Sequence, residues 1–167
     1  MSEREELWLE IEDAPGYAVS DMGRVQNSRT GRILSLSRTS RGGNKVGLVV
    51  DGEQAPKIVK NLVAEHFVPG RTDIFDIAIH MDGNPYNDDA SNLVWRPRWF
   101  ALKYARQFKD AYANAGRGPI RNIERDVLYE TVYDASVANG LLFRDVFSSC
   151  LDGEPVFPDW ETFEWLH

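Results

Sequence analysis

A histidine at the end of an apolar run stands before a loop that is rich in asparagine and aspartate. The run covers residues 77–80 and ends on His80, the loop continues to Asn92, and the segment closes on Leu93-Val94-Trp95. Asn and Asp side chains bond to nearby backbone groups, so such a loop can fix its own shape. A histidine at its entrance can act as a general base near neutral pH or pack as a structural residue. The pattern predicts a hairpin with a histidine at its entrance.

The loop residues also resemble the HNH motif of phage intron-encoded nicking homing endonucleases. The matching residues are His80, Asp82-Gly83-Asn84, Asn87, Asn92-Leu93 and Trp95. The resemblance implies metal-assisted hydrolysis of phosphodiester bonds, with His80 as general base and Asn92 as the residue that ties the loop together. It also implies a ββα fold in which the hairpin is followed by a helix.

Three positions depart from that family pattern. Family members carry an oxygen ligand for a divalent ion before the histidine and another on the following helix, where this chain has Ile79 and Ala101. The family often has a histidine at the position of Lys60. Hard cations need oxygen ligands, so the sequence predicts a retained base without a metal site.

We therefore expect no cofactor, or Mg²⁺ or Mn²⁺ if the chain is active. Asp76 and Asp82 are the nearby carboxylates that could substitute as weak metal ligands. Asp76 lies about 13 Å from His80 along an extended strand, which is too far for a shared ion.

The first 50 residues have the pattern of a small antiparallel sheet. Residues 17–20 alternate like a strand, Asp21-Met22-Gly23 can turn the chain, and residues 31–34 repeat the turn-to-strand pattern. This stretch resembles the modular motif that precedes HNH domains in homing endonucleases. The candidate phosphate contacts here are Arg24, Arg29, Arg32, Arg38, Arg41 and Lys45.

The rest of the chain predicts an α+β fold in consecutive parts. We expect a lead-in β module at 1–50, an HNH-like ββα domain at 51–115 whose last helix covers 98–115, a linker at 116–119 and a C-terminal domain at 120–167. Helical segments at 131–138 and 142–151, separated by Asn139-Gly140, are similar to the helix-turn-helix repeats of the same nucleases. The DNA-contacting candidates in these parts are Arg98, Lys103, Arg106 and Arg144.

Charge is distributed unevenly along the chain. The formal net charge is −7, yet residues 21–60 carry eight basic and three acidic side chains, and residues 96–125 carry eight and two. Two basic segments can supply the positive face that a phosphate backbone needs. Residues 126–167 carry Arg144 and nine acidic side chains, so this block can equally serve a packing or protein-contact role.

These features favour a DNA-binding protein derived from an HNH homing endonuclease, with metal-dependent cleavage lost or weakened. One alternative is an active nicking endonuclease for double-stranded DNA, and another is a phage-type regulator that binds a host protein. No stretch is apolar enough to span a membrane, and the acidic N-terminus is unlike a signal peptide. We expect a cytoplasmic protein.

Overall fold

The computed structural model describes residues 4–109 and 117–166. Their contacts divide them into two units. The first unit contains the residues up to His80 together with Asn84–Pro97, and the second contains Met81–Gly83 and the residues from Arg98 onward. Small antiparallel sheets and helices make up both units, which confirms the predicted α+β fold class.

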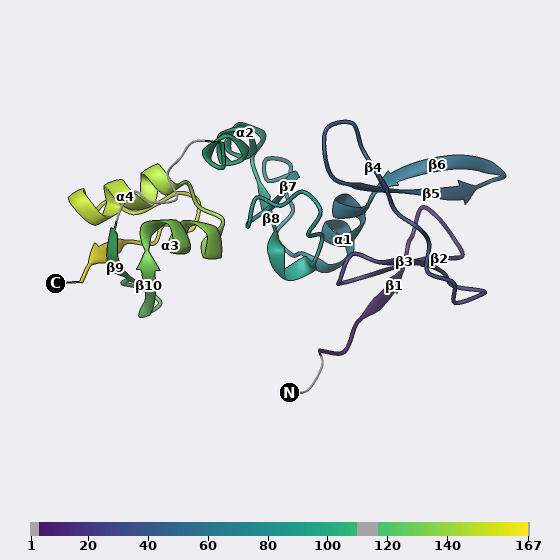
Figure 1. Cartoon of the computed structure of the whole chain (residues 1–167), viewed down its shortest axis with the longest axis horizontal. Helices are drawn as coiled ribbons and strands as arrows, with labels where there is room; N and C mark the ends of the chain where they lie inside the picture. The colour runs from purple at the N-terminus through teal and green to yellow at the C-terminus, as the bar shows by residue number, and fades with distance from the viewer. Residues whose placement is uncertain (1–3, 110–116, 167) are drawn as a thin grey trace. The chain divides into compact units, whose positions relative to one another are not determined.

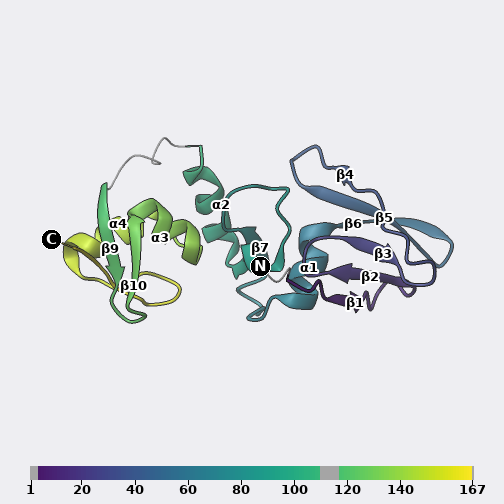
Figure 2. The same cartoon turned by 60° about the horizontal axis from the view of Figure 1, so that its bottom comes forward.

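The first unit begins with a three-stranded antiparallel sheet whose strands lie side by side (Figure 2). The strands are β1 (Trp8–Glu10), β2 (Tyr17–Ser20) and β3 (Val25–Asn27). Val19 and Val25 face each other across β2 and β3 and are fully buried. The strand predicted at 17–20 is confirmed, whereas the one predicted at 31–34 is wrong. That segment makes a single bridge, between Gln26 and Ile33.

A second antiparallel sheet follows in the same unit (Figure 1). Its strands are β4 (Ser37–Arg38), β5 (Asn44–Val50) and β6 (Glu53–Ile58). Asp51 and Gly52, both at positive φ, form the two-residue turn of the β5–β6 hairpin. The partner strand β6 starts at Glu53, because a two-residue turn pairs the residues on either side of it.

One helix and a hairpin complete the first unit. Helix α1 (Val59–Phe67) buries Val59, Leu62, Val63 and Ala64. Strands β7 (Ile77–His80) and β8 (Leu93–Arg96) pair antiparallel, with the short helix η1 (Ala90–Asn92) before β8. Ala78 and Trp95 join the side chains of α1 in the core of this unit.

The second unit combines helices with a three-stranded sheet in the order β10-β9-β11. Its elements are α2 (Arg98–Gln107), β9 (Arg117–Asn122), β10 (Val127–Thr131), α3 (Val132–Asn139), α4 (Phe143–Asp152) and β11 (Phe163–Trp165). The helix predicted at 98–115 ends at Gln107, and residues 110–116 lie outside the described residues. Residues 117–119, predicted as linker, lie in β9.

Helices α3 and α4 meet at a tight turn, as predicted. Thr131 caps α3 by accepting a hydrogen bond from the Asp134 amide, and Gly140 ends it at φ 61° in the left-handed region. The amide of Leu141 returns to the Ser136 carbonyl at 2.8 Å. This turn leaves only three residues between the end of α3 and the start of α4.

The terminal aromatic residues pack within the second unit. The Phe157 ring lies 5.4 Å from the Trp99 ring and 6.0 Å from the Phe100 ring, centroid to centroid. Trp165 meets Phe147 edge-on. The helices in the described part of the chain are all too short or too polar to cross a membrane.

Candidate functional site at the hairpin histidine

His80 ends strand β7 and is held by a carboxylate. Its Nε2 atom lies 2.7 Å from Oδ1 of Asp88, and the two side chains are 12% and 1% exposed. When Nε2–H donates to Asp88, the lone pair of the neutral ring is on Nδ1. The contact therefore orients an imidazole in the way that a general base requires.

Asp88 is engaged through both of its oxygens. Its Oδ2 accepts a hydrogen bond of 2.8 Å from the Asn44 amide, which also donates to the Tyr86 carbonyl at 3.2 Å. Asn44 opens strand β5, so the lead-in sheets contribute directly to the site. A buried carboxylate with satisfied oxygens is a rigid support.

The turn before β3 also packs against Asp88. A Cβ atom at Gly23, where φ is +82°, would lie 2.9 Å from the Cβ of Asp88. The next loop residues are tied to the same turn, since the Ala90 amide donates to the Asp21 carbonyl at 2.8 Å. Gly23 thus allows an approach of lead-in and loop that a larger residue would prevent.

Lys60 is a half-buried cation close to this network. It lies in the first turn of α1, where the helix dipole disfavours a positive charge. Burial lowers the pKa of the Lys60 ammonium below its ordinary value, and the Asp88 carboxylate acts in the opposite direction. Burial and the helix dipole therefore both disfavour the positive charge of Lys60, and the negative charge of Asp88 partly offsets them.

The loop between the two strands fixes its own shape. The Asn92 amide donates to the Asn87 carbonyl at 2.9 Å, and Oδ1 of Asn84 accepts from the Tyr86 amide at 3.1 Å. Asp89 caps η1 by accepting from the Ser91 amide at 2.9 Å. These bonds explain why a segment with few apolar residues is well formed.

The side chains around His80 do not fit a divalent cation of the family type. The Ile79 side chain is buried and has no oxygen, and both oxygens of Asp88 already accept hydrogen bonds. The alanine at position 101 of the sequence supplies no oxygen ligand either. Asp76 is exposed ahead of β7, and Asp82 is half-buried. Across residues 4–109 and 117–166, no three His, Cys, Asp or Glu side chains gather in a way that could hold a metal.

Most lead-in residues predicted to contact phosphate are exposed, and two of them are engaged with neighbours. Arg24 is paired with Glu6 and lies 5.6 Å from the Trp8 ring centroid. The Arg38 guanidinium lies 4.6 Å from the Tyr86 ring centroid. The exposed residues are Arg24, Arg29, Arg32, Arg38 and Arg41, and Lys45 is half-buried.

The candidates of the second unit are also exposed, and the structure brings three of them together. Lys103 and Arg106 on α2 line the same pocket as Arg144 on α4, whereas Arg98 lies outside it. The sequence had placed Lys103 and Arg144 in separate predicted domains.

Three residues of the His80 network were missed by reasoning from sequence. Asp88 and Asn44 were not singled out, and Lys60 was noted as a departure without a role. The signal for Asp88 was its position in the loop, eight residues after His80. Asn44 gave no signal, because its contact depends on how the lead-in sheets pack.

Lead-in sheets, a hairpin with a histidine at the end of its first strand, a following helix and a helix-turn-helix unit follow one another along the chain. A family model described as the NUMOD4 motif matches residues 6–48. A solved structure titled "DNA binding and cleavage by the HNH homing endonuclease I-HmuI" has a similar fold, with a TM-score of 0.54 and 23% identity. The alignment covers 96% of this chain and 98% of that chain.

Curated relatives agree with this fold. The DNA endonuclease I-HmuI of Bacillus phage SP01 is 33% identical over 89 residues, which are 53% of this chain and 51% of that protein. The uncharacterized HNH endonuclease L245 of Acanthamoeba polyphaga mimivirus is 25% identical over 152 residues, which are 86% of this chain and 44% of that protein. The chain thus spans about half of these relatives. The chain is similar to HNH homing endonucleases in its lead-in motif, in its sequence similarity to these relatives and in its fold.

Proposed function

We propose that this chain binds double-stranded DNA and has lost, or strongly weakened, the metal-dependent cleavage of its family. The observation that carries the proposal is the state of the carboxylate beside the histidine. Asp88 uses one oxygen for His80 and the other for Asn44, and the residue before His80 is a buried isoleucine. A hard cation in this position would have to share carboxylate oxygens that already accept hydrogen bonds, and it would gain no ligand from the isoleucine side chain.

Lys60 supports the same proposal. In HNH catalysis the divalent ion supplies positive charge beside the histidine. Here a half-buried ammonium lies close enough to Asp88 for their charges to interact. A fixed ammonium can attract a DNA phosphate, but it does not provide the Lewis acidity of a metal ion.

DNA as the partner is supported by the relatives and by the charge distribution. I-HmuI is named a DNA endonuclease, and two segments of this chain are basic although the whole chain is acidic. The relatives are named as endonucleases, which gives no support to the host-protein alternative.

An active nicking endonuclease is the second candidate. The hydrogen bond between His80 and Asp88 favours it, because it orients a ring nitrogen as a base. In that case Mg²⁺ or Mn²⁺ would need ligands such as Asp76 or Asp82, acting through water.

A gel-shift titration tests DNA binding. We expect duplex DNA to be shifted equally well in EDTA and in Mg²⁺, with an affinity that falls steeply as salt rises, because binding releases counterions. Absence of a shift at low salt would contradict the proposal, and a shift that requires Mg²⁺ would favour the nicking alternative.

A further inference from the structure

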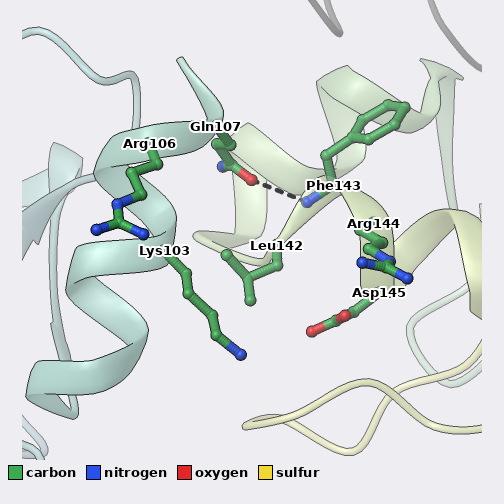
Figure 3. A pocket seen from close by; sticks show the side chains of 7 residues that line it. All are labelled: Lys103, Arg106, Gln107, Leu142, Phe143, Arg144 and Asp145. Carbon is green, nitrogen blue, oxygen red and sulfur yellow. Dashed lines mark hydrogen bonds between the residues drawn. The ribbon is translucent and has the colours of Figure 1, made fainter. Parts of the chain in front are cut away.

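A pocket of about 410 Å³ opens between α2 and the start of α4 in the second unit. Figure 3 shows Lys103 extending from α2 toward the side where Arg144 and Asp145 project from α4. Arg106 lines the pocket from the α2 side, and Leu142 forms part of its wall. The hairpin site around His80 does not account for this group of charged side chains in one cavity.

Gln107 fixes the two elements that form the pocket. Its Oε1 accepts a hydrogen bond of 3.0 Å from the Phe143 amide, and its Nε2 donates to the Leu141 carbonyl at 3.4 Å. The residue is 8% exposed. The first amide of α4 is therefore already satisfied, so an anion in the pocket would be held by side chains rather than by the helix terminus.

The cations of this pocket differ from other arginines of the same unit. Arg121 is paired with Asp126, and Arg125 with Glu161. Within the described residues, Lys103, Arg106 and Arg144 form no ion pair, and Lys103 lies 5.2 Å from the Trp99 ring centroid. Cations that line one cavity repel each other, and a bound anion would relieve that repulsion.

Asp145 is the acidic residue of the pocket. Burial raises the pKa of its carboxyl above the ordinary value, while Lys103 and Arg144 act in the opposite direction. Its charge reduces the positive potential of the cavity without cancelling it, since two cations, Lys103 and Arg144, act on this one carboxyl group.

We propose that this pocket binds one phosphate group, held jointly by Lys103 from α2 and Arg144 from α4. The inference rests on the proposed function, in which the phosphate belongs to a DNA backbone. A shared phosphate site also explains how α4 could bind DNA although residues 126–167 are acidic. Arg144 is the sole basic residue among nine acidic ones in 126–167, and Lys103 and Arg106 add the positive charge that α4 lacks.

A phosphate held from both helices would set how α4 meets the duplex. Backbone contacts position a recognition helix, and base contacts then read the sequence. In this unit the α2 contact and the α4 contact would fall on the same phosphate. The two side chains should then act as one energetic unit rather than as two independent charges.

A double-mutant cycle tests this coupling. We expect Lys103→Gln and Arg144→Gln each to weaken duplex binding about tenfold, and to reduce the salt dependence by about one phosphate contact. The double variant should lose clearly less than the product of the two effects. Lys109→Gln is the control, since Lys109 is exposed near the end of α2 and outside the pocket; it should weaken binding less than about threefold.

A gain-of-affinity variant and a second probe complete the experiment. Asp145→Asn should tighten duplex binding, because it removes a negative charge from the phosphate site. Inorganic phosphate should shift the backbone NMR signals around Arg144 in the wild-type chain, and this shift should be lost in Lys103→Gln.

The outcomes separate the pocket from the proposed function. Phosphate-dependent shifts without duplex binding would leave a free-phosphate site and contradict the DNA proposal. Two other results would overturn the shared phosphate site while leaving DNA binding in place. In the first, neither single variant changes duplex binding. In the second, the double variant weakens binding by the full product of the two single effects.

Discussion

At the scale of single residues, the contact between His80 and Asp88 organises the hairpin site. Asp88 accepts from two donors, the His80 ring and the Asn44 amide. Asp88→Asn replaces one acceptor oxygen by an NH₂ group, which would face one of those donors. We expect a loss of about 1–3 kcal/mol in the free energy of unfolding, because a buried donor is left without a partner. Urea denaturation measures it, with the exposed Asp73→Asn as control.

Lys60 allows a second test, in which stability and binding move in opposite directions. Burial lowers its pKa, so the folded chain releases this proton at a lower pH than the unfolded chain does. The penalty for burying the charge is present at neutral pH and fades as the pH rises toward the ordinary lysine value. Lys60→Met should therefore raise the free energy of unfolding at pH 7 by on the order of 1 kcal/mol, and weaken duplex binding.

The pH dependence distinguishes this cause from better packing. Chemical denaturation of both proteins should show that the advantage of Lys60→Met shrinks between neutral pH and pH values near 10.5, the ordinary pKa of a lysine. The exposed Lys109→Met should bring no such gain. An advantage for Lys60→Met that stays constant over that range would mean that charge burial is not its source.

Residue types in the loop could be read from sequence, while their partners could not. His80 and Asn92 stood out because a hairpin loop has local geometry, and local spacing is visible in a sequence. Asp88 lies in the same loop, but its importance comes from Asn44, which is 44 residues away along the chain. Contacts of this kind depend on tertiary packing, which no local pattern encodes.

At the scale of elements, the lead-in sheets support the site as well as presenting basic side chains. Gly23 permits the close approach of Asp88, and Asn44 bonds to it. Gly23→Ala should lower the free energy of unfolding by about 1–3 kcal/mol more than Gly16→Ala. Both glycines have positive φ, but a Cβ at Gly16 meets nothing within 4 Å, so the comparison isolates the clash. If both variants lose the same free energy of unfolding in thermal or urea denaturation, the structure relieves the clash at Gly23 by a small shift.

Elements with strong local signals were predictable, and those with conflicting signals were not. Helix α3 is bounded by a capping threonine and a glycine in the left-handed region, and α4 has a periodic apolar pattern. Strand β9 was missed because Gly118-Pro119 is typical of a linker. The pairing of β9 with β10 shifts register between Tyr129 and Thr131, and this irregularity accommodates the proline within the strand.

At the scale of the whole molecule, we propose that a chain with a negative net charge binds DNA through segments that are locally basic. The net charge is −7, but basic side chains are concentrated in residues 21–60 and 96–125. Long-range attraction should be weak, and contacts with individual phosphates should dominate. We therefore expect a linear plot of log K against log salt concentration whose slope is about −0.9 for each phosphate contacted. A slope near zero in a filter-binding titration would contradict backbone binding.

Nicking of supercoiled plasmid under single-turnover conditions tests the central claim, that the scaffold is retained while its metal chemistry is lost. Wild type and His80→Ala would be compared in EDTA, Mg²⁺ and Mn²⁺ at protein concentrations that saturate the DNA in gel shifts. We predict bound plasmid without nicking above the level of His80→Ala in all three conditions. Nicking that requires a divalent ion and disappears in His80→Ala would contradict the account and identify an active endonuclease.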